Sequence, residues 1–182
     1  MLDIFKDCMW KNFGGCMEML ANAIAMYPED NWSSNKKFFY GAYHTLVFLD
    51  YYLSIPPKNF SAPLPFTLIE YNNIPEDAID DVMPDSMYSK KELLGYVAFC
   101  REKCRKLIAG LTEEQLKTSW IQGAENADLA LSGQEALSYS VLEIFFYNMR
   151  HVQHHTAQLN LLLRQQIHNA PEYISHTKDE LQ

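Results

Sequence analysis

Hydrophobic residues recur at three- and four-residue steps in four long segments of this chain, and no segment shows a convincing strand-like alternation. This spacing gathers the apolar side chains on one face of an α-helix. The first helix is predicted from Asp3 to Met26. The second begins near Asn35 and stops before Pro56, because proline cannot continue a helix. Amphipathic helices bury their apolar faces against one another, so we expect an all-α four-helix bundle.

Capping boxes mark where the later helices begin. In this motif Ser or Thr is followed three residues later by Glu or Gln, and each side chain bonds to the backbone N–H of the other residue. Ser89 and Glu92 predict the start of the third helix. Ser132 and Glu135 predict the start of the longest helix, which we expect to end near Ile167.

A long proline-rich connection separates the second and third helices. Between residues 54 and 88 the helical windows are broken by Pro56, Pro57, Pro63, Pro65, Pro75 and Pro84. A structureless connection of this length is unusual in a compact domain. We therefore expect it to fold over the bundle and to cover a pocket. The length and apolar content of residues 1–182 predict a single domain around one core.

Two adjacent glycines, Gly14 and Gly15, stand in the middle of the first predicted helix. Each costs about 1 kcal/mol of helix stability relative to alanine. A pair at that cost indicates that something approaches the helix closely. We expect either a close helix contact or a local bend at this point.

The chain carries 15 basic and 23 acidic residues, a formal net charge of −8 at pH 7. This charge repels phosphate backbones, so we expect no nucleic-acid partner. No window approaches the roughly 18 uninterrupted apolar residues of a membrane span, and the first residues lack the features of a secretory signal. We therefore expect no membrane partner and a cytoplasmic location.

Three histidines, His151, His154 and His155, share one turn of the longest predicted helix. With His151 set at zero and about 100° per residue, His155 lies at roughly 40° and His154 near −60°. The apolar stripe of this helix lies at roughly 20–80° and is formed by Leu137, Val141, Ile144, Leu159 and Leu162. His151 and His155 are therefore predicted to point inward together, while His154 lies off the edge of the buried face.

Two imidazoles on a buried face need partners, because an unmatched buried polar group is costly. Nitrogens at positions i and i+4 converge on one point, as in zinc-binding H-E-x-x-H helices, although the glutamate of that motif is missing here. His44 stands at the centre of the second predicted helix, which is apolar almost all round. A lone histidine there is more often a satisfied core residue. Together with His151 and His155, however, it predicts a metal site with open coordination positions.

The histidine pattern resembles that of the DinB-like metal-binding bundles. Their last helix typically reads H-x-x-H-H-x-G-Q-L with a downstream arginine, and this chain reads HVQHHTAQLNLLLR after a single histidine in the second helix. The resemblance spans nearly the whole chain. It implies that the metal ligands are His44, His151 and His155. Ala157 stands where the family has glycine, and the proline-rich connection matches no feature of the family pattern.

Two classes of function follow. The first is a divalent-metal-dependent enzyme, a hydrolase or a thiol S-transferase, acting on a small molecule; the resemblance adds low-molecular-weight thiols as substrates and a homodimer as assembly state. Imidazole suits several transition metals, and we expect zinc or nickel. The alternative is a non-catalytic metal-binding bundle that acts through dimerisation or a protein partner. A pocket reached by water at the three histidines would favour the enzyme, and a plugged site the alternative.

Five polar residues are available as acid, base or orienting groups near this site. Asp50 lies about 120° round the helix from His44, so we expect it behind the ligands or at the surface. Glu143 is expected at the surface. The other three are Tyr40, Tyr51 and Asn148.

Overall fold

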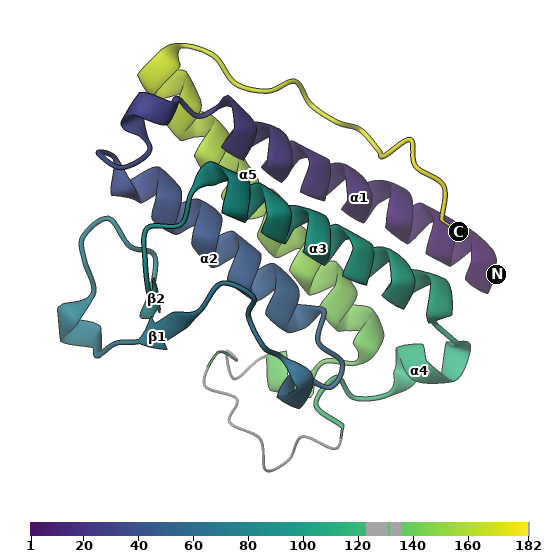
Figure 1. Cartoon of the computed structure of the whole chain (residues 1–182). Helices are drawn as coiled ribbons and strands as arrows, with labels where there is room; N and C mark the ends of the chain where they lie inside the picture. The colour runs from purple at the N-terminus through teal and green to yellow at the C-terminus, as the bar shows by residue number, and fades with distance from the viewer. Residues whose placement is uncertain (123–130, 132–135, 182) are drawn as a thin grey trace.

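The computed structural model describes residues 1–122, 131 and 136–181, and this part of the chain is mostly helical (Figure 1). The all-α class expected from the apolar spacing is confirmed, with a small two-stranded sheet added to it. The helices are α1 (Leu2–Met26), α2 (Lys36–Tyr52), α3 (Lys90–Gly110), α4 (Glu113–Lys117) and α5 (Val141–Ile167).

The long helices pack side by side. Helix α1 contacts α3 and α5, and α2 contacts the same two helices (Figure 1). Every residue of α2 from 41 to 52 is buried, which agrees with its apolar character all round. The α2–α5 contact brings together the two helices that carry the histidines singled out in the sequence.

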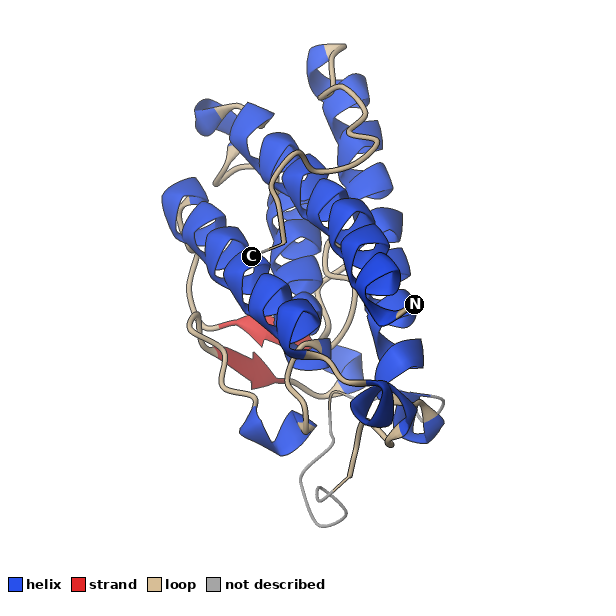
Figure 2. Ribbon diagram, turned by 90° about the vertical axis from the view of Figure 1, so that its right-hand side faces the viewer, coloured by secondary structure: helices blue, strands red, loops and turns tan. Residues whose placement is uncertain are grey.

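The proline-rich connection is ordered against α2. It contains the short antiparallel strands β1 (Phe66–Leu68) and β2 (Val82–Pro84), drawn in red in Figure 2. Hydroxyl groups from α2 and from the end of the connection hold it in place. Tyr43 Oη in α2 and Tyr88 Oη before α3 donate hydrogen bonds to the carbonyl oxygen of Pro65, at 3.0 and 2.7 Å. The expectation that this segment folds over the helices is confirmed.

Helix α5 begins later than the sequence predicted. The expected capping pair, Ser132 and Glu135, lies outside the described residues, and the helix starts at Val141. Its cap is a second S-x-x-E pattern further along the chain. Ser140 Oγ accepts a hydrogen bond from Glu143 N at 3.3 Å, and Glu143 Oε2 accepts one from Ser140 N at 2.8 Å. Two similar motifs stand close together in the sequence, and local pattern alone did not distinguish them.

The C-terminal segment explains the glycine pair in α1. After α5 the chain turns at His168, whose φ is 55°, and runs back along α1 (Figure 1). Thr177 N donates a hydrogen bond of 2.8 Å to the carbonyl oxygen of Lys11. A Cβ placed on Gly14 would lie 2.6 Å from Thr177 Cγ2, and Gly15 faces the backbone of the same segment. The predicted close contact is present, but its partner is this extended segment and not a helix.

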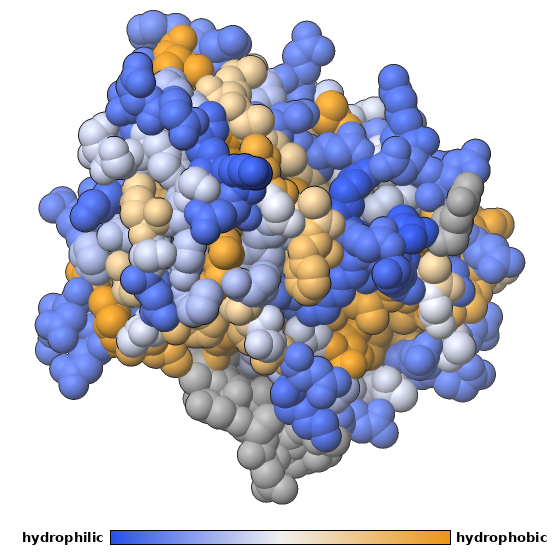
Figure 3. All heavy atoms as spheres, in the orientation of Figure 1, coloured by the Kyte–Doolittle hydropathy of each residue, from blue (hydrophilic) through white to orange (hydrophobic). Residues whose placement is uncertain are grey.

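The molecular surface mixes hydrophilic and hydrophobic side chains. On the face seen in Figure 3, hydrophobic groups occur in several separate places between hydrophilic ones. Such scattering is ordinary for a folded protein. None of the helices in the described part of the chain is long and apolar enough to cross a membrane.

Candidate metal centre

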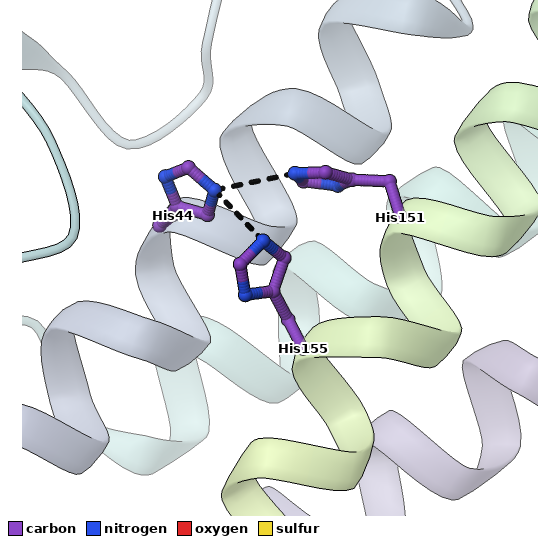
Figure 4. Close-up of side chains that lie close together, drawn as sticks. All are labelled: His44, His151 and His155. Atoms are coloured by element: carbon purple, nitrogen blue, oxygen red, sulfur yellow. Dashed lines mark hydrogen bonds between the residues drawn. The ribbon is translucent and has the colours of Figure 1, made fainter.

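The three predicted ligands meet between α2 and α5. His44 lies at the middle of α2, and His151 and His155 lie one turn apart on α5. Figure 4 shows the three rings pointing toward a common point from the two helices. The α5 ligands share its inward face with Asn148, Val152 and Leu159, all of which are buried. The face assignment made from the sequence therefore holds for His151 and His155.

The spacing of the ring nitrogens suits a metal ion. His44 Nε2 lies 3.2 Å from His151 Nε2 and 3.2 Å from His155 Nε2 (Figure 4). One ring nitrogen from each of the three residues lies within 4.8 Å of the others. Tetrahedral zinc with nitrogens at about 2.0–2.1 Å separates two ligands by roughly 3.3 Å. The two separations from His44 Nε2 match that spacing.

Burial keeps two of these imidazoles neutral. Removal from water, followed by the nearby imidazoles His155 and His44, lowers the pKa of His151 to about 2. Removal from water and the proximity of His44 lower the pKa of His155 to about 4. Metal ions bind the neutral form of imidazole, so both rings are in the state that coordination requires at neutral pH.

A glutamine fixes which nitrogen of His155 carries the hydrogen. Gln158 Oε1 lies 2.8 Å from His155 Nδ1, and Gln158 Nε2 lies 3.1 Å from His154 Nε2. An amide oxygen only accepts hydrogen bonds, so Nδ1 of His155 must be the donor. Its Nε2 then carries a lone pair directed at His44. Outer hydrogen bonds of this kind commonly orient metal-binding histidines.

A carboxylate stands behind His44. Asp80 Oδ2 lies 2.9 Å from His44 Nδ1, on the side of the ring away from the other histidines. The two groups are close, but His44 Nδ1 has no partner among the described residues that meets the geometry of a hydrogen bond. Sequence reasoning missed Asp80, because it lies in the connection with no motif around it. Only the folding of that connection onto α2 brings it here.

The three rings cannot satisfy one another. If His44 Nε2 donates, it has one hydrogen for two neighbouring acceptors; if it accepts, the lone pair of His155 Nε2 faces it unpaired. His151 Nδ1 is also buried without a hydrogen-bond partner among the described residues. A cation would accept all three lone pairs at once, so this donor set fits a divalent transition metal.

Space for a small molecule adjoins the histidines. His155 lines a groove of about 470 Å³ that runs between α2 and α5. One wall of the groove comes from the connection, as expected for a segment that covers a pocket, and consists of Glu76, Asp77, Ala78 and Ile79. The ring of Phe48 lies 4.6 Å from that of His44. Of the three histidines, His155 is the one that lines this groove, and an aromatic ring packs beside His44.

Asp50 does not belong to the site. Its side chain is 1% exposed and lies 2.5 Å from Lys103 Nζ, and it accepts a hydrogen bond from Tyr96 Oη at 2.9 Å. The expectation that it stands behind the ligands or at the surface is wrong. The reason is that its face of α2 packs against α3, which supplies a cation and a hydroxyl group.

The remaining polar candidates have structural contacts. Asn148 Nδ2 donates a 3.0 Å hydrogen bond to a carbonyl oxygen of α2, and Glu143 caps α5 at the surface. The rings of Tyr40 and Tyr51 pack on aromatic neighbours. His154 is exposed, in agreement with its predicted position off the buried face.

Comparison with protein-family models, with curated proteins and with solved structures found no match to this chain. The case for function therefore depends on the geometry of the site.

Proposed function

We propose that His44, His151 and His155 hold a divalent transition metal, zinc or nickel, and that the protein is a metal-dependent enzyme of the DinB-like class. The observation that carries the proposal is the convergence of three ring nitrogens, with His44 Nε2 at 3.2 Å from each of the other two, and with no arrangement of hydrogens that satisfies them all. The side-by-side packing of α1, α2, α3 and α5 suits the four-helix bundle of that class.

The surroundings of the site favour catalysis over a purely structural ion. When bound, a divalent ion supplies Lewis-acid chemistry that suits hydrolysis and thiol transfer. The chain contributes three imidazole ligands, an aromatic ring at Phe48 beside His44 and a groove that His155 lines. A groove of this size admits a small molecule, and a low-molecular-weight thiol is the substrate that we propose.

Metal content tests the ligand set. Elemental analysis of protein purified without an affinity tag should give close to one ion per chain. Replacing any one of His44, His151 and His155 by alanine should abolish binding, because two imidazoles alone hold a divalent ion weakly. His154→Ala is the matched control and should retain the ion, since His154 is exposed and does not contribute to the three converging nitrogens. Equal loss in that variant would show that the ligands are wrongly assigned.

Activity is tested separately with the metal-loaded protein. The protein is incubated with a low-molecular-weight thiol and an electrophile that carries a leaving group, and the consumption of free thiol is followed. The wild type should consume thiol faster than His151→Ala under the same conditions. Equal rates would exclude thiol transfer at this site while leaving the metal-binding result intact.

A further inference from the structure

We infer that Asp80 is a positioning residue that orients the ring of His44 for metal binding. Through the same contact it holds the proline-rich connection against α2 at the metal site. The inference rests on the proposed function, since it concerns the same histidines. It adds a residue outside the helices, and it couples a surface segment to the ion.

Asp80 is itself held in place by β2, the strand that follows it in the chain. Its Oδ1 accepts a hydrogen bond of 3.1 Å from Val82 N, at the start of β2, while Oδ2 faces His44 Nδ1 at 2.9 Å. The neighbouring Ile79 packs directly on α2, because its Cδ1 lies 3.8 Å from where a Cβ on Gly41 would stand. The carboxylate therefore belongs to a segment seated on α2 one turn before His44, and its side chain is only 27% exposed.

The position of the carboxylate determines which nitrogen of His44 faces the other histidines as a lone pair. A neutral imidazole carries one hydrogen, and a carboxylate accepts but does not donate. A hydrogen on Nδ1, beside Asp80, leaves the lone pair on Nε2, where His151 and His155 converge. A negative charge behind the ring also makes it a stronger ligand, as in carboxylate–histidine–zinc arrangements. A slight rotation of the ring would align its N–H with the carboxylate.

The same contact links metal binding to the connection. A cation at Nε2 polarises the ring and strengthens the attraction between Nδ1–H and Asp80. Such coupling is reciprocal. If a bound ion stabilises the packing of the connection on α2, that packing also increases the affinity for the ion. Zinc should therefore reduce amide hydrogen exchange around residues 66–84 in the wild type, and this protection should disappear when Asp80 is replaced.

Zinc affinity provides the main test, measured by competition with a chromophoric chelator. Outer-sphere partners of metal ligands typically contribute 10- to 100-fold, so Asp80→Ala should weaken zinc binding by about that factor. Asp80→Asn retains an acceptor but removes the charge, and it should give a smaller loss. Asp81→Ala is the matched control, because the adjacent acidic residue is removed without touching His44, and its affinity should equal that of the wild type.

A second measurement needs no metal. Imidazole ¹⁵N chemical shifts of the metal-free protein distinguish a hydrogen on Nδ1 from one on Nε2, and His44 should carry it on Nδ1 in the wild type and lose this preference in Asp80→Ala. Unchanged zinc affinity in both Asp80 variants, or a hydrogen on Nε2 of His44 in the wild type, would overturn this inference but not the proposed function. A wild type that binds no zinc or nickel would overturn both the proposed function and this inference.

Discussion

Gly14 shows how one missing side chain shapes this molecule. The space that a side chain at this position would fill is taken by the methyl group of Thr177. Arg101 Nη1 donates a 2.9 Å hydrogen bond to the carbonyl oxygen of Gly14. A glycine inside a helix is normally unfavourable. Here the cost is offset by the close approach of the C-terminal segment, and the contact explains why a larger residue is absent.

Alanine substitution at two glycines separates helix propensity from close packing. Gly95 lies in α3 with nothing within 4 Å of an added Cβ, so Gly95→Ala should raise the free energy of unfolding by about 0.5–1 kcal/mol. Gly14→Ala should lower it by about 1 kcal/mol or more, because the new Cβ meets Thr177. Urea denaturation measures both. Adding Thr177→Ser removes the methyl group and should restore stability; no recovery would mean that this contact is not the cause.

At the scale of single elements, the capping pattern predicted the start of α3 correctly but not that of α5. Ser89 Oγ accepts a hydrogen bond from Glu92 N and caps α3 as predicted. For α5, the pair used is Ser140 and Glu143, whose side chains satisfy backbone groups that a helix end leaves free. The helix that carries two of the three candidate ligands thus begins three turns before His151.

Removing the α5 cap tests where this helix begins. Ser140→Ala should lower the free energy of unfolding by about 1 kcal/mol, the usual cost of losing an N-cap hydroxyl group. Ser33, which is exposed in the turn before α2, provides the control, and Ser33→Ala should change stability by less than about 0.5 kcal/mol. Thermal unfolding followed by circular dichroism measures both variants. Equal effects would show that Ser140 does not cap the helix.

Across the whole molecule, a buried ion pair joins two helices. Asp50 of α2 is 1% exposed, and it is compensated by Lys103 of α3 and by the Tyr96 hydroxyl group. Lys103 Nζ also contacts Ser54 Oγ at 2.8 Å, beyond the end of α2. A buried pair of this kind adds little net stability compared with apolar residues, but it strongly penalises any packing that separates the two charges.

Breaking this pair should therefore cost more than breaking an exposed one. Lys103→Ala leaves a buried carboxylate without its cation and should lower the free energy of unfolding by about 3 kcal/mol. Lys106→Ala, which removes a largely exposed lysine paired with Glu102, should cost less than about 1 kcal/mol. Combining Lys103→Met with Asp50→Asn should recover most of the loss. Chemical denaturation would contradict this account if Lys103→Ala matched Lys106→Ala.

Part of the candidate site was accessible from periodicity. The steps of three and four residues predicted the helices, and the same rotation per residue placed His151 and His155 on the buried face and His154 off it. Such local rules work because backbone geometry repeats along a helix and needs no knowledge of its neighbours. They could not say that His44 lies opposite the pair; that was a hypothesis from chemistry, and the packing of α2 on α5 brings the rings together.

Long-range contacts settled the rest. Asp80 reaches His44, Lys103 reaches Asp50, and Thr177 fills the space at Gly14, each across a separation along the chain that no repeating pattern spans. The amino-acid order alone predicted the helical class, the inward direction of His151 and His155, and a close contact at Gly14 and Gly15. The identity of these partners depends on the three-dimensional packing, because the environment of a side chain is formed by the segments that fold against it. Which segments pack together is determined by the free energy of the entire chain.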